Sequence, residues 1–385
     1  MSFLVSPSNK QAKTNDRWHS AAQQLAETAG VGFNGTEPWD IQVRNPCFYR
    51  RLFQEGLIGL GESYMEGWWE CERLDLLFTR LVEAHLGEKM PKQLPILISL
   101  IWARIVNRQS RQRAWIVGEE HYDLGNDLFE VMLDSRMQYS CAYWQAANNL
   151  EEAQASKLDL ICRKLAIEPG MKLLDIGCGW GGLAEYAASH YGASVVGITI
   201  SKEQHQLARE RCKGLDVEIR LQDYRDLNQK FDRVVSVGMF EHVGPRNYDT
   251  FFKVVKQALS ESGLFLLHTI GSLTTDLTVN PWIEKYIFPN GCLPSMLQIT
   301  QSSEDLFVVE DWHNFGADYD HTLVEWEKRF TAGWPDLREN YSDSFYRMFR
   351  YYLLSCAGGF RARDLQLWQI LFSYQGVPGG IRVPR

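Results

Sequence analysis

The chain has 385 residues, of which 45% are hydrophobic and 23% charged, the composition of a folded globular protein with room for two domains. Its net charge of −8 excludes a general attraction of the whole molecule to nucleic acid. None of the eight cysteines belongs to a C-x-x-C pair, so we expect neither a metal site nor a dithiol redox site.

The N-terminal part is expected to form a small, mostly helical domain over residues 1–105, with Gly and Pro breaking the helical pattern repeatedly. Residues 106–120 are interpreted as a linker. The sequence shows no basic region followed by an apolar run at its start, and no stretch of about 18 apolar residues. We therefore expect a cytoplasmic protein with reduced thiols and no membrane-spanning helix.

Segment 89–113 differs from the rest of the chain, because it carries six basic residues and no acidic one. As a helix it would place apolar and basic side chains on separate faces, the first with Ile98, Ile101, Trp102 and Ile105, the second with Arg104, Arg108 and Arg111. A basic amphipathic helix can lie on an anionic membrane surface. It can also connect two domains with its arginines in water, and the segment alone leaves both interpretations open.

From residue 121 to residue 385, apolar strands alternate with helical patterns. This alternation predicts a doubly wound α/β domain with a parallel sheet, which is a Rossmann-like fold. The stretches expected as buried parallel strands lie at 171–177, 193–200, 217–223, 231–238 and 262–270. Sheets of this kind bind their ligands outside the carboxyl ends of the strands, so the residues there are the first candidates for a site.

The first of these strands runs into L-L-D-I-G-C-G-W-G-G, residues 173–182. Gly177, Gly179 and Gly181 permit positive φ and a close approach of a ligand to the backbone. Asp175 before the loop suits a cationic ligand and disfavours a pyrophosphate. The G-x-G-x-G spacing resembles the first motif of S-adenosylmethionine-dependent methyltransferases and differs from the dinucleotide G-x-G-x-x-G. An ordinary tight turn between strand and helix is the alternative interpretation.

Two later strand ends offer polar candidates for the same ligand. After the second strand the chain reads G-I-T-I-S-K-E-Q, without the acid that methyltransferases often carry there. Thr199 and Gln204 are therefore the candidates for contacts with ribose hydroxyls. After the third strand, L-Q-D-Y-R places Asp223 and Tyr224 where they can flank an adenine. Surface turns are the alternative interpretation at both places.

Four further stretches carry a closer resemblance: H-Y-D-L-G-N-D-L-F (121–129), M-Q-Y-S-C-A-Y-W (137–144), F-E-H-V-G (240–244) and E-D-W-H-N-F-G-A-D-Y (310–319). With the glycine loop, they make the whole chain similar to cyclopropane-fatty-acyl-phospholipid synthases. The resemblance implies transfer of a methylene group from S-adenosylmethionine to the cis double bond of an unsaturated phospholipid in a bilayer. It also adds Tyr139 and Ser140 to the cofactor-binding candidates.

The same resemblance implies a bound bicarbonate as the base that closes the ring. By motif, its holders are Cys141, Glu241, His268 and Tyr319, with a contribution from the Ile270 backbone. Glu241 and His268 are expected just beyond the ends of two strands, where both can reach one crevice. Histidine and tyrosine can donate hydrogen bonds to an anion, and the glutamate can accept one from bicarbonate's hydroxyl. His242 is expected to fix the turn or to contact the cofactor edge, without a catalytic role.

Cys356, in L-L-S-C-A-G-G-F, is a second candidate catalytic cysteine, and a small core thiol beside close-packed Ala-Gly-Gly is the alternative. Aromatic stripes at 323–334 and 341–352 fit either an acyl channel or an aromatic core. A lipid substrate favours peripheral membrane contact through segment 89–113, and the N-terminal domain could support a homodimer. Two other functions stay open: a fatty-acyl methyltransferase that leaves a methyl branch, and a non-catalytic lipid-binding protein on a methyltransferase scaffold.

Overall fold

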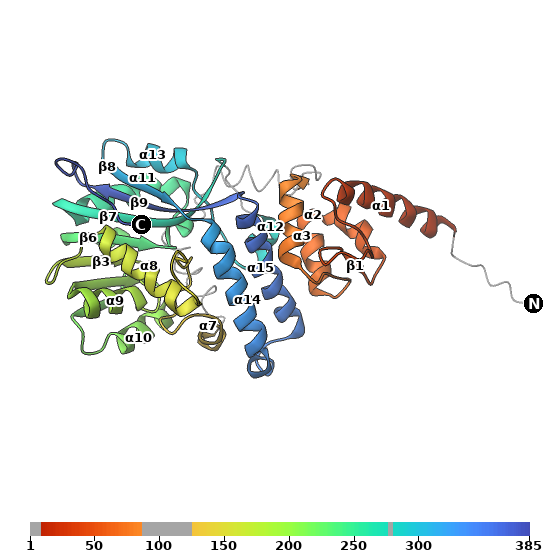
Figure 1. Ribbon diagram of the computed structural model, residues 1–385, viewed down its shortest axis with the longest axis horizontal. Helices are drawn as coiled ribbons and strands as arrows, with labels where there is room; N and C mark the ends of the chain where they lie inside the picture. Colours follow the sequence, from red (N-terminus) through yellow and green to blue (C-terminus); the bar gives the residue numbers. More distant parts are fainter. Residues whose placement is uncertain (1–8, 87–124, 276–279) are drawn as a thin grey trace, which may run out of the picture.

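The computed structural model describes residues 9–86, 125–275 and 280–385 and contains one large α/β layer structure with a helical extension (Figure 1). Its seven-stranded sheet has the order β5-β4-β3-β6-β7-β9-β8. The strands are β3 (Lys172–Ile176), β4 (Ser194–Thr199), β5 (Val217–Leu221), β6 (Phe231–Val237), β7 (Leu259–Ser272), β8 (Val308–Asn314) and β9 (Leu365–Ser373). The first five run parallel, which confirms the predicted α/β fold and its five strands.

The last two strands were not predicted, and they change where one candidate residue lies. β9 pairs antiparallel with β7, and β8 pairs antiparallel with β9. Pairing with β9 extends β7 to Ser272, four residues past the last residue of β7 that pairs with β6. His268 therefore lies inside a strand, paired with Val237 and Gln369, and the expectation that it follows the strand end is wrong.

Helices cover both faces of the sheet, each with its own buried cluster. On one face lie α8 (Leu150–Lys164), α9 (Gly182–Tyr191) and α10 (Lys202–Arg211). On the other lie α11 (Tyr248–Ala258) and α13 (Met296–Ser303). Three short 3-10 turns follow strand ends or precede α11: η1 (Tyr224–Asp226), η2 (Phe240–His242) and η3 (Pro245–Asn247). The order of strands reverses between β3 and β6, so the crevice between their carboxyl ends is the expected ligand site.

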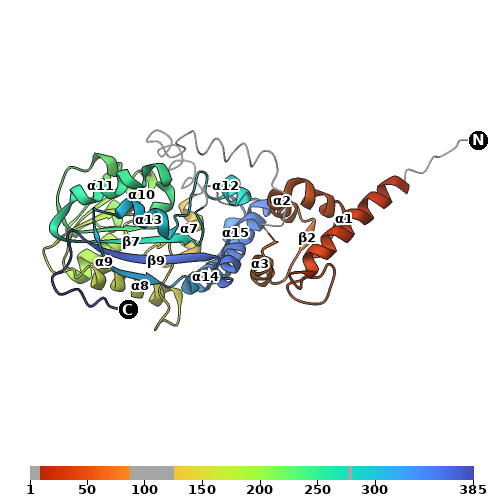
Figure 2. The same ribbon diagram turned by 90° about the horizontal axis from the view of Figure 1, so that it is seen from above.

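The N-terminal part is mostly helical and packs against the C-terminal helices (Figures 1 and 2). It contains α1 (Asn9–Glu27), α2 (Cys47–Met65), α3 (Leu74–Glu83) and a small antiparallel pair of strands, β1 (Gln42–Val43) and β2 (Trp69–Glu70). Its α2 and α3 contact α15 (Asp343–Arg361), and α2 also contacts α12 (Pro281–Tyr286). On the other side, α15 packs on α14 (Ala317–Leu337), which packs on α7 (Asn126–Met132). One continuous buried cluster joins Leu77 and Phe78 of α3 to Phe349 and Leu353 of α15.

The proposed domain boundary at residue 105, the linker 106–120 and the basic segment 89–113 lie outside the residues that the structure describes. Within the described ranges, no helix combines the length and the apolar character needed to cross a membrane.

Candidate active site

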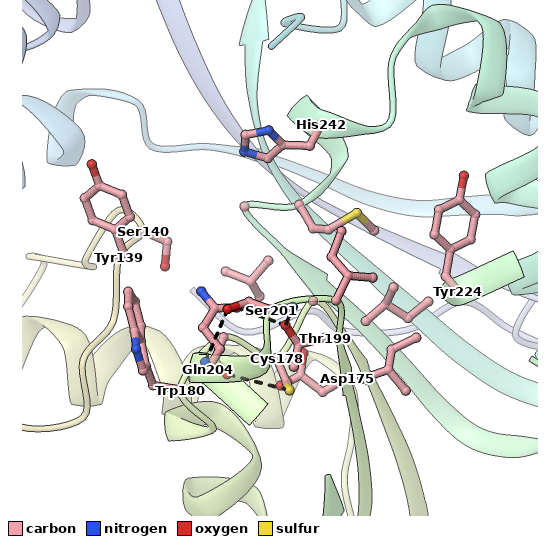
Figure 3. A pocket seen from close by; sticks show the side chains of 18 of the residues that line it. Tyr139, Ser140, Asp175, Cys178, Trp180, Thr199, Ser201, Gln204, Tyr224 and His242 are labelled. Atoms are coloured by element: carbon pink, nitrogen blue, oxygen red, sulfur yellow. Dashed lines mark hydrogen bonds between the residues drawn. The ribbon is translucent and has the colours of Figure 1, made fainter. Parts of the chain in front are cut away.

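A cavity opens at the carboxyl ends of β3, β4 and β6, at the reversal of strand order. It is lined by most of the predicted cofactor-binding residues, namely Tyr139, Ser140, Asp175, Gly177, Gly179, Thr199, Gln204, Asp223 and Tyr224. Figure 3 shows Tyr139 and Trp180 on one side of this cavity and Tyr224 on the opposite side. Sequence reasoning thus located the cavity wall from four separate segments.

The glycine loop has the positive φ angles that its sequence predicts, and its members differ in what they do. Gly177 has φ +82°, and a Cβ there would lie 2.8 Å from the side chain of Met239, so this glycine lets the loop pass the chain after β6. Gly181 does not line the cavity. A Cβ on it would meet the Cβ of Ala208 at 3.0 Å, so this glycine allows α9 to pack closely on α10.

Asp175 is a buried acidic residue in the cavity wall. Only 2% of the residue is exposed, and its Oδ2 atom has no hydrogen-bond partner among the described residues. Burial raises the pKa of Asp175 to about 7, and the positive charge of Lys157 opposes this rise. A carboxylate with an unused buried oxygen is poised to accept a cationic or hydrogen-bond-donating ligand.

The other predicted polar residues are already hydrogen-bonded in pairs. The Thr199 hydroxyl donates to Oε1 of Gln204 at 2.9 Å, so these two side chains form one unit at the end of β4 (Figure 3). At the end of β5, the Asp223 carboxylate caps η1 by accepting from the Arg225 backbone, and it pairs with the Arg225 guanidinium at 2.9 Å. The Tyr224 hydroxyl is buried without a partner among the described residues.

Sequence reasoning missed the buried lysine that holds one wall of the cavity. Lys157 of α8 is fully buried, and its Nζ donates to Gln138 Oε1 at 2.7 Å and to Ser140 Oγ at 2.9 Å. From the same helix, Gln154 Nε2 donates to the Ser140 carbonyl at 2.9 Å. Gln154, Lys157 and Ile161 lie on the same buried face of α8. Two polar residues on an otherwise apolar helix face could have indicated from the sequence alone that they bind a neighbouring segment.

A second group of predicted residues gathers beside the cavity, without lining it. Glu241 lies in η2, immediately after β6, and its Oε1 accepts a hydrogen bond from the Ile270 backbone amide at 2.6 Å. The other oxygen, Oε2, is buried and has no partner in the described part of the chain. Burial raises the pKa of Glu241 to about 7, against the stabilising effect of the Ile270 amide.

His268 can supply a hydrogen-bond donor, where Glu241 supplies an acceptor. Its Nδ1 lies 3.2 Å from the side-chain amide nitrogen of Gln369, and in the tautomer whose Nδ1 accepts from this amide the ring proton is on Nε2. That Nε2 is buried without a partner among the described residues. Burial, together with the positive charges of Lys157 and Lys164, holds the pKa of His268 well below its usual value. The imidazole is therefore neutral and presents a single N–H.

Tyr319 and the two candidate cysteines lie next to this group. Tyr319 sits in the first turn of α14, and the groups that interact electrostatically with its hydroxyl include Cys141, Glu241 and Cys356. Burial raises the pKa of the Tyr319 hydroxyl and of the Cys141 thiol well above their ordinary values, and that of Cys356 to about 12. All three groups are protonated at neutral pH, and neither thiol is a thiolate.

Glu241 and His242 are neighbours in sequence and face different places, for a reason other than strand alternation. β6 ends at Val237, and both residues belong to the 3-10 turn η2, so the expected period of two does not apply. The turn aims Glu241 at Ile270 and leaves His242 on the wall of the cavity (Figure 3). Burial lowers the pKa of His242 to about 4, so this ring is neutral.

Comparison with known proteins decides the family. Residues 109–370, more than half of the chain, match the family described as mycolic acid cyclopropane synthetase. The chain belongs to this family. It is 62% identical over 96% of its length, and over 97% of the relative, to a cyclopropane-fatty-acyl-phospholipid synthase of Escherichia coli K12. Membership makes it an enzyme of the S-adenosylmethionine-dependent cyclopropane synthase class, which sets aside the non-catalytic lipid-binding alternative.

Two other members of the group show how far the likeness extends. A tuberculostearic acid methyltransferase of Mycobacterium tuberculosis is 35% identical over 87% of this chain and 83% of its own. A crystal structure of mycolic acid cyclopropane synthase complexed with S-adenosylhomocysteine and CTAB superposes with a TM-score of 0.64 at 32% identity. That superposition covers 67% of this chain and 97% of the synthase.

The aromatic stripes of α14 and α15 pack against each other beside the site. Leu323, Trp326 and Phe330 are buried, and the ring of Phe330 lies 5.1 Å from that of Phe349. The Trp326 ring lies 5.1 Å from Tyr139, which lines the cavity, so this family member has an aromatic core that reaches the site. Within the described residues, no three His, Cys, Asp or Glu side chains are grouped to hold a metal ion.

Proposed function

We propose that the chain transfers a methylene group from S-adenosylmethionine to the cis double bond of an unsaturated phospholipid acyl chain and closes a cyclopropane ring. The observation that carries this proposal is the pair of unused buried polar atoms beside the cavity, Glu241 Oε2 and His268 Nε2. Buried polar groups without partners are costly in a folded protein. The Ile270 amide that holds Glu241 is two residues beyond His268 in β7, so these two groups on neighbouring segments favour a ligand there. The name of the Escherichia coli relative supports the same reaction.

The cavity residues fit the cofactor. Bound S-adenosylmethionine supplies an electrophilic methyl group on a sulfonium cation. Asp175 offers an unused carboxylate oxygen to its positively charged part, and the linked Thr199 and Gln204 suit the ribose hydroxyls. Tyr139 lies between the cavity and the buried ring of Trp326, where an aromatic face stabilises positive charge by about 1–2 kcal/mol.

The second group fits a bicarbonate. When bound, this anion supplies the oxygen that takes a proton from the transferred carbon, so that the ring closes without a net charge on the lipid. The Tyr319 hydroxyl can donate to it, because burial raises the pKa of this group and keeps it protonated. Neutral His268 can donate through Nε2 in the tautomer whose Nδ1 accepts from Gln369. Glu241 can accept from its hydroxyl through Oε2 while Oε1 stays bonded to Ile270. The role of Glu241 is thus to hold and orient the base.

Cys141 completes this proposed group as a backbone donor or a neutral thiol. Its side chain is fully buried beside Thr322 and Asp318, and its raised pKa disfavours a nucleophilic thiolate. Cys356 is near the Tyr319 hydroxyl and is also protonated at neutral pH. We therefore propose that neither cysteine forms a covalent bond with the substrate, and that both shape the wall around the reacting carbon.

One alternative reaction has specific support, because a relative at 35% identity is named as a tuberculostearic acid methyltransferase. A methyltransferase that leaves a methyl branch would use the same cofactor cavity. Peripheral membrane contact through segment 89–113, a cytoplasmic location and a homodimer also belong to the proposal.

The deciding experiment incubates the protein with methyl-labelled S-adenosylmethionine and vesicles of an unsaturated phospholipid. We expect label in the acyl chain, and proton NMR of the lipid should show the upfield signals of a cyclopropane. Removal of dissolved carbon dioxide should slow the reaction, and added bicarbonate should restore it. Label in lipid without the upfield signals would establish the methyl-branch alternative, and an absence of label would refute both.

A further inference from the structure

Three exposed apolar side chains gather at one place near the site. Six large hydrophobic residues are exposed among those that the structure describes: Leu221, Leu273, Met296, Leu297, Val308 and Val309. Leu273, Met296 and Leu297 are the most exposed of these, at 65%, 49% and 55%. We call these three residues the apolar tip. Large apolar groups that stay together in water often mark an interaction surface.

Backbone pairing holds the apolar tip together. Ser272, at the end of β7, forms a parallel bridge with Ser295, just before α13. The Ser272 amide donates to the Pro294 carbonyl at 2.9 Å, and the hydroxyls of Thr275 and Ser295 are 2.7 Å apart. Leu273 and Met296 each follow one of the two paired serines, so they are neighbours across the bridge. The tip is therefore a fixed feature of two joined segments.

Each of the two segments that carry the tip is hydrogen-bonded to Glu241 a few residues before it reaches the tip. The Ile270 amide donates to the Glu241 carboxylate, and the Cys292 amide donates to the Glu241 backbone carbonyl at 2.9 Å. Leu273 is three residues beyond Ile270, which corresponds to about 10 Å along a strand at roughly 3.3 Å per residue. The apolar tip thus lies on the two segments that lead away from the proposed base-holding group.

The two segments that carry the tip, residues 262–275 and 286–303, hold no Asp, Glu, Lys or Arg. Polar neighbours such as Thr274, Thr300 and Gln298 are uncharged. Burying a charged group in a lipid interface is costly, whereas uncharged polar groups can stay at the level of the headgroups. The lack of charged residues on these two segments is therefore compatible with a membrane surface, and the exposed apolar groups favour it.

We propose that the apolar tip docks on the surface of a phospholipid bilayer and marks where an acyl chain leaves the bilayer for the active site. This inference rests on the proposed function, in which the substrate is a phospholipid chain. The hydrocarbon layer of one leaflet is about 15 Å thick. A tip that enters its outer part would hold Glu241 at a distance comparable to that thickness, so a chain anchored in the leaflet can reach the site without full extraction.

The experiment compares two double variants of the full chain. The tip variant is Leu273→Gln with Leu297→Gln, which removes apolar character without adding charge. The control is Val308→Gln with Val309→Gln, another exposed apolar pair, on β8. Val308 pairs with Ser373, which pairs with Leu264, so the control lies about 30 Å from the tip along the sheet. Binding is measured by sedimentation with unsaturated phosphatidylcholine vesicles, and turnover with vesicles and with the same lipid in detergent.

We expect the tip variant to lose at least about tenfold in vesicle partition, with a raised KM for vesicles and unchanged turnover on detergent-dispersed lipid. The control variant should match the unaltered chain in vesicle partition, in KM for vesicles and in turnover on detergent-dispersed lipid. Equal vesicle partition of the tip variant and the control would overturn the proposal. So would a tip variant whose oligomeric state changes while its partition stays constant, since the tip would then join two copies. If the unaltered chain binds vesicles through the tip but makes no cyclopropane, the proposed function fails and the docking surface stands.

Discussion

The buried amino group of Lys157 donates a hydrogen bond to the Ser140 hydroxyl at 2.9 Å, and so fixes one wall of the cofactor cavity to helix α8. Its second bond, to Gln138, holds the same wall two residues earlier. The side chain touches no cavity space itself, because Lys157 is absent from the lining residues. It acts as a positioning residue for the segment that carries Tyr139 and Ser140.

Replacement Lys157→Met should therefore weaken cofactor binding. Methionine has a similar length but leaves two buried partners without a donor, at a cost of about 1–3 kcal/mol for each group. We expect S-adenosylmethionine to bind about tenfold more weakly or worse by calorimetry. Lys164→Met is the matched control, because Lys164 lies on the same helix, is equally buried and contacts His313 at 3.0 Å, away from the cavity. The idea is wrong if both variants lose stability alike and keep the same affinity.

Cofactor affinity should also depend on pH through Asp175. Its pKa in the free protein is raised to about 7, and a cationic ligand binds best to the ionised carboxylate. Below that pH the proton must leave before binding, so affinity should fall by up to about tenfold for each further pH unit. Calorimetry in buffers of different ionisation enthalpy should detect the released proton. Asp175→Asn should bind more weakly and lose this pH dependence, whereas a flat profile for the unaltered chain would contradict the assignment.

The sequence predicted β3, β4, β6 and β7 from their short apolar runs, and β5 from the alternation of apolar and polar residues in V-E-I-R-L. It did not predict β8 and β9, since V-V-E-D-W-H-N and L-Q-L-W-Q-I-L-F-S mix polar and apolar residues and pair only with distant parts of the chain. His268 lies within the predicted strand 262–270 and pairs with Val237 of β6, and the unpredicted β9 adds its second partner, Gln369.

The candidate site residues also divide into those that a local motif reveals and those that depend on distant parts of the chain. Asp175 and the loop glycines could be found from a local motif, because their role follows from the turn after one strand. Lys157 could not, since the sequence shows a lysine on an apolar helical stripe but not which segment that stripe covers. The grouping of Glu241 and Tyr319 came from resemblance, and only the folded chain shows the Glu241 carboxylate bonded to Ile270.

Glu241→Gln should separate cofactor binding from turnover. The amide keeps an oxygen for the Ile270 N–H and presents an NH₂ where the unaltered chain has the free Oε2. A donor there opposes the hydroxyl of bicarbonate, so we expect turnover to fall by about 100-fold or more. S-adenosylmethionine affinity should stay within error, because Glu241 does not line the cavity. Lost cofactor binding, or retained turnover, would show that its role has been misassigned.

The basic segment makes a separate prediction, drawn from the sequence alone. Charge reversal of Arg104, Arg108 and Arg111 should weaken binding to anionic vesicles, most strongly at low salt where surface charges are screened least. Binding to uncharged phosphatidylcholine vesicles should change little, which distinguishes this segment from the apolar tip. Vesicle sedimentation across a salt series provides the measurement, and unchanged binding to anionic vesicles at low salt would refute the interpretation.

Glu62 links the N-terminal helices to the rim of the cofactor cavity. It accepts from Arg51 at 2.5 Å within α2, and from Lys285 at 2.6 Å and Tyr286 at 2.8 Å on α12. The chain after α12 reaches Pro289 and Asn290, which line the cavity. Loss of the Glu62 contacts should therefore loosen this rim as well as the packing of α2 on α12.

Glu62→Gln is expected to lower the melting temperature and to raise the S-adenosylmethionine dissociation constant severalfold. Burial acts to raise the pKa of Glu62, but hydrogen bonds from Lys285 and Tyr286 outweigh it and hold that pKa below its usual value. Its contribution to stability is therefore present above the ordinary carboxyl pKa and is lost as the pH falls through the lowered one. The melting temperatures of variant and unaltered chain should converge in acid.

Two further variants test whether the effect runs through α12. Glu55→Gln removes an exposed carboxylate that pairs with Arg51 only, so it should change neither the dissociation constant nor the melting temperature by much. Gly61→Ala should reproduce the Glu62 effect, because a Cβ at Gly61 would lie 2.4 Å from the Trp282 ring and push α12 away. If Gly61→Ala destabilises the chain but leaves cofactor affinity unchanged, contact between α2 and α12 supports the fold without positioning the rim.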